Sequence, residues 1–254
     1  MNTDTYIHKS VLRHVQNQVK KHSFGKLVFF SCFGPRSWGF APDNINFDYH
    51  GIYLSKEDNT YWVFVSGAEI NNYPKDITLI SLERFVGDIL RSDIHSFIFI
   101  NGPIIYASKE FLEFKKWINL NLSKRVYETY QIKQSHVERK DYLYDFFFIG
   151  NGISILEKKK VIPNLFKLNK KILKIPAINK IIEEEKIRLP FKDKRECKNT
   201  LNNLKARLEK ANKESRLPKV VDSKKLAKLR LIKKINLYFW YWPKGSDMSR
   251  ERER

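Results

Sequence analysis

Hydrophobic residues recur at every fourth position near the start of the chain, and lysine and histidine occupy positions between them. This spacing places the apolar side chains on one face of a helix. We therefore predict an amphipathic helix over residues 5–22. Its apolar positions are Ile7, Val11, Val15 and Val19.

Short apolar runs rich in β-branched and aromatic residues follow this helix, and they predict strands. The first run, KLVFFSCF, is expected to be a buried strand. Gly34, Pro35 and Gly39 mark a turn after it, and Asp58 with Asn59 marks another. The predicted strands cover residues 26–33, 46–55, 61–66 and 76–81.

Helical spacing takes over beyond the fourth strand. Strand-like runs disappear after about residue 150, where the helical patterns become rich in lysine. Ser108 and Asp222 are suited to cap helices at their first turn, and Pro176 is expected to break one. The predicted helices cover residues 82–91, 108–122, 165–184, 195–214 and 222–235.

Strands mixed with helices, followed by helices alone, predict an α+β (α/β) protein. We expect residues 1–150 to form a mixed β-sheet with flanking helices, and residues 151–236 to form a basic, all-helical C-terminal domain. Residues 237–254 comprise an aromatic segment, YFWYW, and a polar tail expected to be disordered. The aromatic segment suits docking on the core or on a partner protein, with stacking on single-stranded nucleic acid as the alternative.

Charge is distributed unevenly along the chain. The formal net charge is +20, of which residues 1–150 contribute +2 and residues 151–254 contribute +18. A basic half beside a nearly neutral half is typical of a surface that binds RNA or DNA. A solvated lysine-rich face and an acidic protein partner are the alternatives. The candidate nucleic-acid-binding residues are Lys198, Lys205, Lys224, Lys225 and Lys228.

Cysteine spacing and hydropathy predict the cellular compartment of the protein. Cys32 and Cys197 lie far apart without CxxC spacing, which fits a reducing compartment and excludes a cysteine zinc site. No apolar run approaches the roughly 18 residues that indicate a membrane helix. The first 21 residues lack the apolar region of a signal peptide. We expect a cytoplasmic protein with no membrane association.

Oxygen-bearing side chains alternate on the second predicted strand. Asn46 and Asp48 are two residues apart, so they point to the same face, and Asp76 begins a later strand. Carboxylate and amide oxygens are suitable Mg²⁺ ligands, and two metals close together require several negative charges. The Gly34 turn would approach the phosphates of a nucleoside triphosphate. Aspartates that serve only a turn or a strand end are the alternative.

The same stretch resembles the predicted nucleotidyltransferases of the DNA-polymerase-β superfamily. That family has a Gly-Ser-Arg turn, an aromatic-Gly pair and an Asp-x-Asp-Tyr-Arg-Gly strand. The resemblance continues in residues 76–85, 187–190 and 208–222, and it spans about residues 25–235. The positions that match the turn and strand are Gly34, Arg36, Trp38, Gly39, Asp48, Tyr49 and Gly51.

The resemblance implies a nucleotidyltransferase-type fold and Mg²⁺-dependent transfer of a nucleotidyl group from a nucleoside triphosphate to RNA or protein. By this likeness Asp48 and Asp76 are the catalytic metal ligands, and Asn46 is a neutral supplementary ligand. The nucleotide-binding residues implied are Gly34, Arg36 and Gly39.

Three residues depart from the family's pattern. Pro35 replaces the turn serine and removes both a hydroxyl and a backbone N–H. Asn46 replaces the first aspartate with a neutral amide, and His50 replaces an arginine. The changes at Pro35 and Asn46 predict weakened activity. The alternative is an inactive scaffold with the same fold, a pseudoenzyme that binds nucleic acid or assembles with protein.

Overall fold

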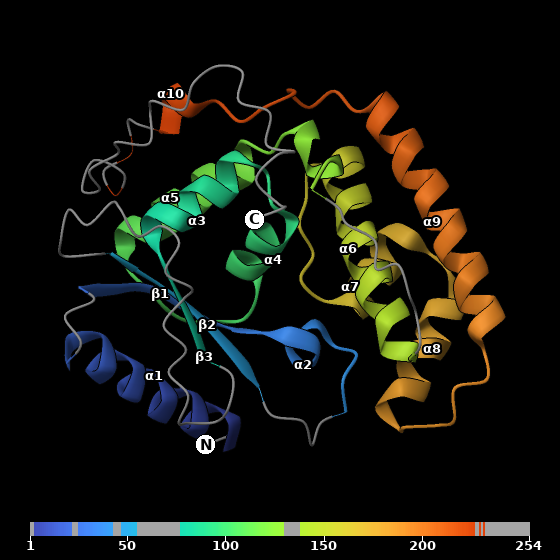
Figure 1. The fold of residues 1–254 in the computed structure, drawn as a ribbon, viewed down its shortest axis with the longest axis horizontal. Coiled ribbons are helices and arrows are strands. Elements are labelled where there is room, and N and C mark those ends of the chain that lie inside the picture. The colour runs from blue at the N-terminus through green and yellow to red at the C-terminus, as the bar shows by residue number, and fades with distance from the viewer. Residues whose placement is uncertain are drawn as a thin grey trace, which may run out of the picture.

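A computed structural model of the 254-residue chain describes residues 3–21, 25–42, 47–54, 77–129, 138–226, 229 and 231. These residues form a mixed four-stranded sheet with flanking helices, and the C-terminal part is mostly helical (Figure 1). The chain is therefore an α+β protein, as predicted. The strand predicted at residues 61–66 and the segment 237–254 lie outside the described residues.

The sheet has the strand order β3-β2-β1-β4. β1 pairs antiparallel with both β2 and β4, whereas β2 pairs parallel with β3. The predicted bounds of β1 are confirmed at both ends. Among the described residues β2 begins at Asp48 rather than earlier, whereas residues 46, 55 and 76 of the predicted strands lie outside the described residues. The strands are β1 (Lys26–Phe33), β2 (Asp48–Leu54), β3 (Ile77–Ser81) and β4 (Ile104–Ala107).

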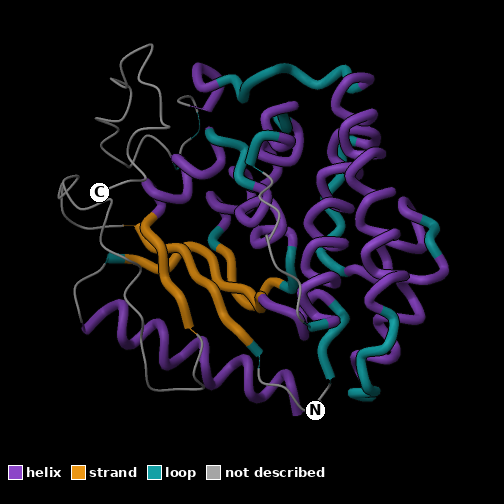
Figure 2. Tube along the Cα trace, turned by 45° about the vertical axis from the view of Figure 1, so that its right-hand side comes forward, coloured by secondary structure: helices purple, strands orange, loops and turns teal. Residues whose placement is uncertain are grey.

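Helix α1 (Thr3–Lys21) covers one face of the sheet (Figure 2). Val11, Val15 and Val19 are buried there in a cluster that includes Tyr49 of β2. The amphipathic helix predicted at residues 5–22 is confirmed, because the apolar stripe meets the apolar side of the sheet.

Three helices cover the opposite face: α3 (Leu82–Leu90), α4 (Ile94–Asn101) and α5 (Lys109–Leu120) (Figure 1). The Ser108 hydroxyl accepts a hydrogen bond from the N–H of Phe111 at 3.2 Å, which confirms the predicted cap of α5. These helices bury the side chains of the sheet that point away from α1.

The C-terminal helices follow a short 3₁₀ turn, η2 (Lys124–Tyr127). The break predicted at Pro176 is confirmed, because this proline is the first residue of α8, where its missing N–H is tolerated. The elements are α6 (Arg139–Lys158), α7 (Leu165–Leu168), the π-helix η3 (Asn169–Leu173), α8 (Pro176–Lys186), α9 (Lys194–Glu214) and α10 (Ser223–Leu226).

Helix α6 runs across residue 150, the predicted boundary between the two parts. One cluster of buried side chains includes Phe29 of β1, Phe147 of α6 and Leu204 of α9. The separation into a sheet domain and a helical domain stays a prediction. No helix among the described residues is both long and apolar enough to cross a membrane.

Candidate nucleotide-binding site

A short helix, α2 (Gly34–Trp38), begins directly where β1 ends. Phe33, the last residue of β1, pairs with Asp48, the first residue of β2. Gly34 and Gly39 bound α2 with positive φ values of 80° and 85°. Only glycine adopts such angles without strain, so the two motif glycines fix the chain's path around this turn.

The carboxylate of Asp48 lies against the backbone of Gly34. A Cβ atom added to Gly34 would stand 1.8 Å from Oδ2 of Asp48 and 2.7 Å from its Cγ. No real side chain tolerates such distances. The glycine of the turn and the aspartate of the strand, which sequence analysis assigned to one site, are therefore in direct contact.

Gly39 has a similar relation to the C-terminal helices. A Cβ atom at this position would lie 2.2 Å from Nδ2 of Asn164. Asn164 caps α7, because its Oδ1 accepts a hydrogen bond from the N–H of Lys167 at 3.0 Å. The helical part of the chain thus touches the predicted nucleotide-binding turn.

Arg36 is held at the same end of the sheet. Its Cζ lies 3.7 Å from the centroid of the Phe47 ring, a cation–π contact with the residue that precedes Asp48. The Ser37 hydroxyl donates to the Gly34 carbonyl at 2.9 Å and braces α2 from within. A guanidinium therefore stands beside the strand that carries the carboxylate.

Tyr144 of α6 joins the site, and sequence analysis missed it. Its ring makes edge contacts with Trp38 and Phe40, with centroid distances of 5.5 Å to each. Burial first, and then the negative charges of Asp48 and Asp141, together raise the pKa of Tyr144 to about 12. The phenol is thus neutral at pH 7 and within electrostatic reach of the Asp48 carboxylate. A tyrosine in the aromatic run YLYDFFF was the available signal.

His50 occupies the position where the resembled family has an arginine. Its ring stacks on Phe33 with a centroid distance of 4.1 Å and makes an edge contact with Phe99 at 5.5 Å. Burial lowers the pKa of His50 to about 4. The imidazole is therefore uncharged at pH 7 and does not replace the arginine's positive charge.

Two predicted metal ligands, Asn46 and Asp76, lie outside the described residues. The prediction that they share a face with Asp48 therefore stays a prediction. β3 begins at Ile77, which pairs in parallel with Tyr49, the neighbour of Asp48. Among the described residues, no three His, Cys, Asp or Glu side chains gather in a group able to hold a metal ion.

Four of the five lysines predicted to bind nucleic acid lie on the C-terminal helices. Lys198 and Lys205 belong to α9 and Lys224 to α10, and Lys205 is partly buried whereas the other two are exposed. The side chain of Lys225 and the whole of Lys228 lie outside the described residues. Their role in nucleic-acid binding stays a prediction.

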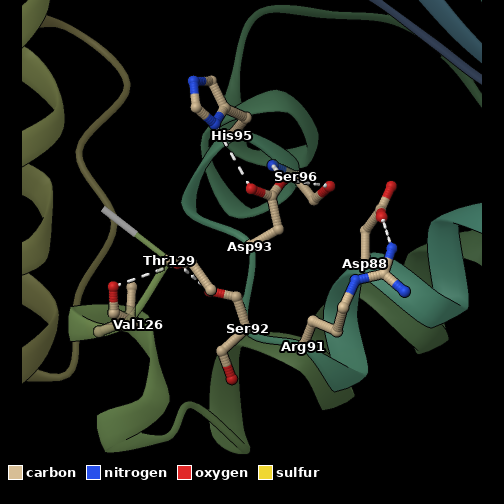
Figure 3. A network of polar contacts seen from close by, with 8 residues as sticks. All are labelled: Asp88, Arg91, Ser92, Asp93, His95, Ser96, Val126 and Thr129. Carbon is tan, nitrogen blue, oxygen red and sulfur yellow. Dashed lines mark hydrogen bonds and ion pairs between the residues drawn. The ribbon is translucent and has the colours of Figure 1, made fainter. Parts of the chain in front are cut away.

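A network of polar contacts lies at the start of α4 (Figure 3). Asp93 accepts hydrogen bonds from the N–H and the hydroxyl of Ser96, both at 2.9 Å, and its Oδ1 is 3.4 Å from Nδ1 of His95. The His95 ring lies 4.2 Å from that of Phe148 in α6. Because Ser96 bonds the aspartate rather than the histidine, this is a helix cap and not a nucleophilic triad.

The sheet, its glycine-bounded turn and the strand that begins at Asp48 are the features on which the sequence resembles the DNA-polymerase-β superfamily. The model of one family in that superfamily, the RNA repair pathway DNA polymerase beta family (RlaP), matches residues 7–232, and the chain belongs to this family. The likeness found in the sequence is thereby confirmed. Neither the curated proteins nor the solved structures that were searched contained a match.

Proposed function

We infer that this protein transfers a nucleotidyl group from a nucleoside triphosphate to an acceptor on RNA, with Mg²⁺, at the site formed by α2 and the start of β2. The observation that carries this proposal is the contact between Gly34 and the Asp48 carboxylate in a chain of the RNA repair pathway DNA polymerase beta family. That contact brings a metal-binding oxygen next to a turn suited to phosphate.

Asp48 and Asp76 are the residues that would hold Mg²⁺, with Asn46 as a neutral supplementary ligand. The carboxylate of Asp48 is the hard oxygen donor that Mg²⁺ prefers. Tyr49 pairs in parallel with Ile77, and in the sequence Asp48 and Asp76 directly precede these two residues. Bound Mg²⁺ would neutralise phosphate charge during transfer.

The turn and α6 would then orient the nucleotide and the carboxylate. Gly34 and Gly39 let the backbone approach the phosphates, and Arg36 supplies a guanidinium next to the Asp48 strand. Tyr144, neutral at pH 7, is a positioning residue because its ring packs on Trp38 and Phe40 within electrostatic reach of the Asp48 carboxylate.

Activity is expected to be weak. Pro35 lies in the first turn of α2, where helix N–H groups are available to anions, and it has no N–H. Asn46 removes one negative charge from the predicted ligands. Nucleotide transfer to RNA should therefore rise when Asn46→Asp is combined with Pro35→Ser.

The test uses labelled nucleoside triphosphates and RNA, each nucleotide tried separately, with Mg²⁺ and with EDTA. Asp48→Ala should abolish both Mg²⁺-dependent nucleotide binding and transfer. If the wild type binds no nucleoside triphosphate, or if Asp48→Ala leaves binding and transfer unchanged, the site does not have this function.

A second candidate function is a scaffold that keeps the fold without catalysis and binds nucleic acid or an acidic protein partner. The neutral His50 in place of the family's arginine favours it, because one phosphate-binding charge is absent. The scaffold would bind RNA with no transfer of label, even in the Asn46→Asp, Pro35→Ser variant.

A further inference from the structure

Seven lysines lie between the end of α6 and the start of α8, and no acidic residue interrupts them. All seven are exposed, and none forms an ion pair with the part of the chain that the structure describes. We call residues 158–174 the lysine segment. Its lysines are Lys158, Lys159, Lys160, Lys167, Lys170, Lys171 and Lys174.

The neighbouring helices carry a different balance of charge. Residues 176–214, which include α8 and α9, hold 11 basic and 7 acidic residues, so their net charge is +4. Several of these cations are already paired, as Lys180 is with Glu196 at 3.5 Å and Arg207 is with Glu157 at 2.9 Å. The lysine segment has a net charge of +7 over 17 residues, and it is therefore the more strongly polyanion-attracting surface.

Hydrogen bonds from three buried polar side chains hold the backbone of the lysine segment in place. Oδ1 of Asn151 accepts from the N–H of Ile162 at 2.8 Å, and the Ser154 hydroxyl donates to the carbonyl of Lys160 at 2.7 Å. Asn169 bonds both the N–H and the carbonyl of Ile175. The lysines therefore extend from a fixed base, which lowers the entropy lost on binding.

The lysine segment also reaches the candidate site. In Figure 1 the chain leaves α6 and turns back to α7, and Asn164 on this path touches Gly39 of the nucleotide-binding turn. Lys167 follows Asn164 by three residues, a helical rise of about 5 Å. Next to it Phe166 is 42% exposed and offers an aromatic face among the cations.

We propose that the lysine segment is the track along which an RNA acceptor strand reaches the nucleotide site, with phosphates on the lysines and a base on Phe166. The proposal rests on the proposed function, which supplies the reason for an acceptor strand at Gly39. An acidic protein would satisfy the charge but not the exposed aromatic ring or the continuity with the turn.

Two triple variants of the full chain test the track. One carries Lys167→Glu, Lys170→Glu and Lys171→Glu in the lysine segment. The matched control carries Lys198→Glu, Lys205→Glu and Lys224→Glu on α9 and α10, with the same change in charge. Fluorescence anisotropy with labelled single-stranded RNA measures Kd across a range of salt concentrations, and circular dichroism verifies that both variants are folded.

The lysine-segment variant should raise Kd at least tenfold more than the control variant does. In a plot of log Kd against log salt concentration, the slope for this variant should be shallower by about 2. Each phosphate contact contributes roughly 0.7 to the slope on single strands, and the variant removes three lysines. RNA that contains 4-thiouridine should crosslink to wild-type peptides from residues 158–174, which keeps the test valid if a variant does not fold.

Equal loss in the two variants would overturn the track and indicate a generic basic surface. Absence of RNA binding by the wild type at low salt would also overturn it, and would leave the charge to an acidic protein. Binding of Mg²⁺-ATP separates this proposal from the proposed function. Asp48→Ala should remove nucleotide binding and leave RNA binding intact, whereas the lysine-segment variant should do the reverse.

Discussion

At the scale of single residues, Gly34 meets two constraints at once. Its φ of 80° disfavours any L side chain, and a Cβ would collide with the Asp48 carboxylate. We predict that Gly34→Ala lowers the free energy of unfolding by about 2–4 kcal/mol and weakens Mg²⁺-dependent nucleotide binding. Urea denaturation and a nucleotide titration measure the two effects.

Gly87→Ala is the matched control for that variant. Gly87 lies within α3, and a Cβ there would meet only the Arg91 side chain at 3.5 Å, an ordinary contact. Alanine in a helix interior is favoured over glycine by up to about 1 kcal/mol, so this change should stabilise the protein. Similar losses of stability in both variants would show that the close contact between Gly34 and the Asp48 carboxylate does not cause the loss.

The hydroxyl of Tyr144 can be tested separately from its ring. Tyr144→Phe keeps the ring that packs on Trp38 and Phe40 but removes the hydroxyl. We predict a three- to tenfold weaker Mg²⁺-dependent nucleotide affinity, because the site would lose a polar group near the Asp48 carboxylate. Tyr142→Phe, in the same helix but packed on Phe191, is the control and should leave affinity unchanged. An equal effect from both would remove Tyr144 from the site.

Asp93 ties stability to pH. Burial alone would raise the pKa of Asp93, but hydrogen bonds and charge from His95 and hydrogen bonds from Ser96 outweigh it, so the pKa lies below 3.8. A lowered folded-state pKa stabilises the protein above the unfolded value, and this contribution is lost as pH falls through the folded value.

We therefore predict that Asp93→Asn, which keeps the capping oxygen, lowers the free energy of unfolding at pH 7 by about 0.3–1 kcal/mol. The difference from the wild type should shrink as pH falls below 3.8. Urea denaturation from pH 7 to pH 3 measures this difference in the free energy of unfolding. If the difference does not change with pH, the negative charge of Asp93 is not its cause.

At the scale of elements, Asn151 joins α6 to the lysine segment. It is fully buried, accepts from the N–H of Ile162 and donates to the carbonyl of Phe147 at 3.0 Å. Asn151→Ala leaves the N–H of Ile162 without this partner and should cost about 2 kcal/mol. Asn202→Ala on the exposed surface of α9 is the control and should change stability by less than about 0.5 kcal/mol. Equal losses of stability in the two variants would contradict the role of Asn151 in joining α6 to the lysine segment.

The elements with clear periodicity could be predicted from the sequence. The valines of α1 repeat every four residues, β1 is one continuous apolar run, and Ser108 is a strong cap. Helix α4 was missed because Phe97, Ile98, Phe99 and Ile100 are all buried, so no polar face marks the helical period. β4 was missed because four residues give too short a signal.

The candidate site was predictable only where its residues are close in the sequence. Gly34 and Asp48 belong to one strand-turn-strand unit, so their contact followed from the motif. Tyr144 and Asn164 reach the same unit through tertiary packing of α6 and α7, for which no local pattern exists. Sequence charge indicated the basic half, but paired and unpaired lysines separate only in three dimensions.

At the scale of the whole molecule, a shared core predicts cooperative unfolding. Phe29, Phe147 and Leu204 belong to one buried cluster, and α6 crosses residue 150. We predict that tryptophan fluorescence and far-ultraviolet circular dichroism follow a single transition with the same midpoint in urea. Two separate transitions would instead support independent sheet and helical domains. Arg139→Met, which removes a buried ion pair with Glu184, should shift both probes together.

Helix α6 has one further consequence, for the order in which the chain is made. Trp38 and Phe40 are covered by rings of Tyr144, Phe147 and Phe148, which leave the ribosome more than 100 residues later. At cellular rates of translation this delay is roughly 5–20 s. The nascent chain therefore carries two uncovered aromatic rings beside its turn throughout that interval. Ribosome-associated chaperones should engage the protein there, and release it once α6 has emerged.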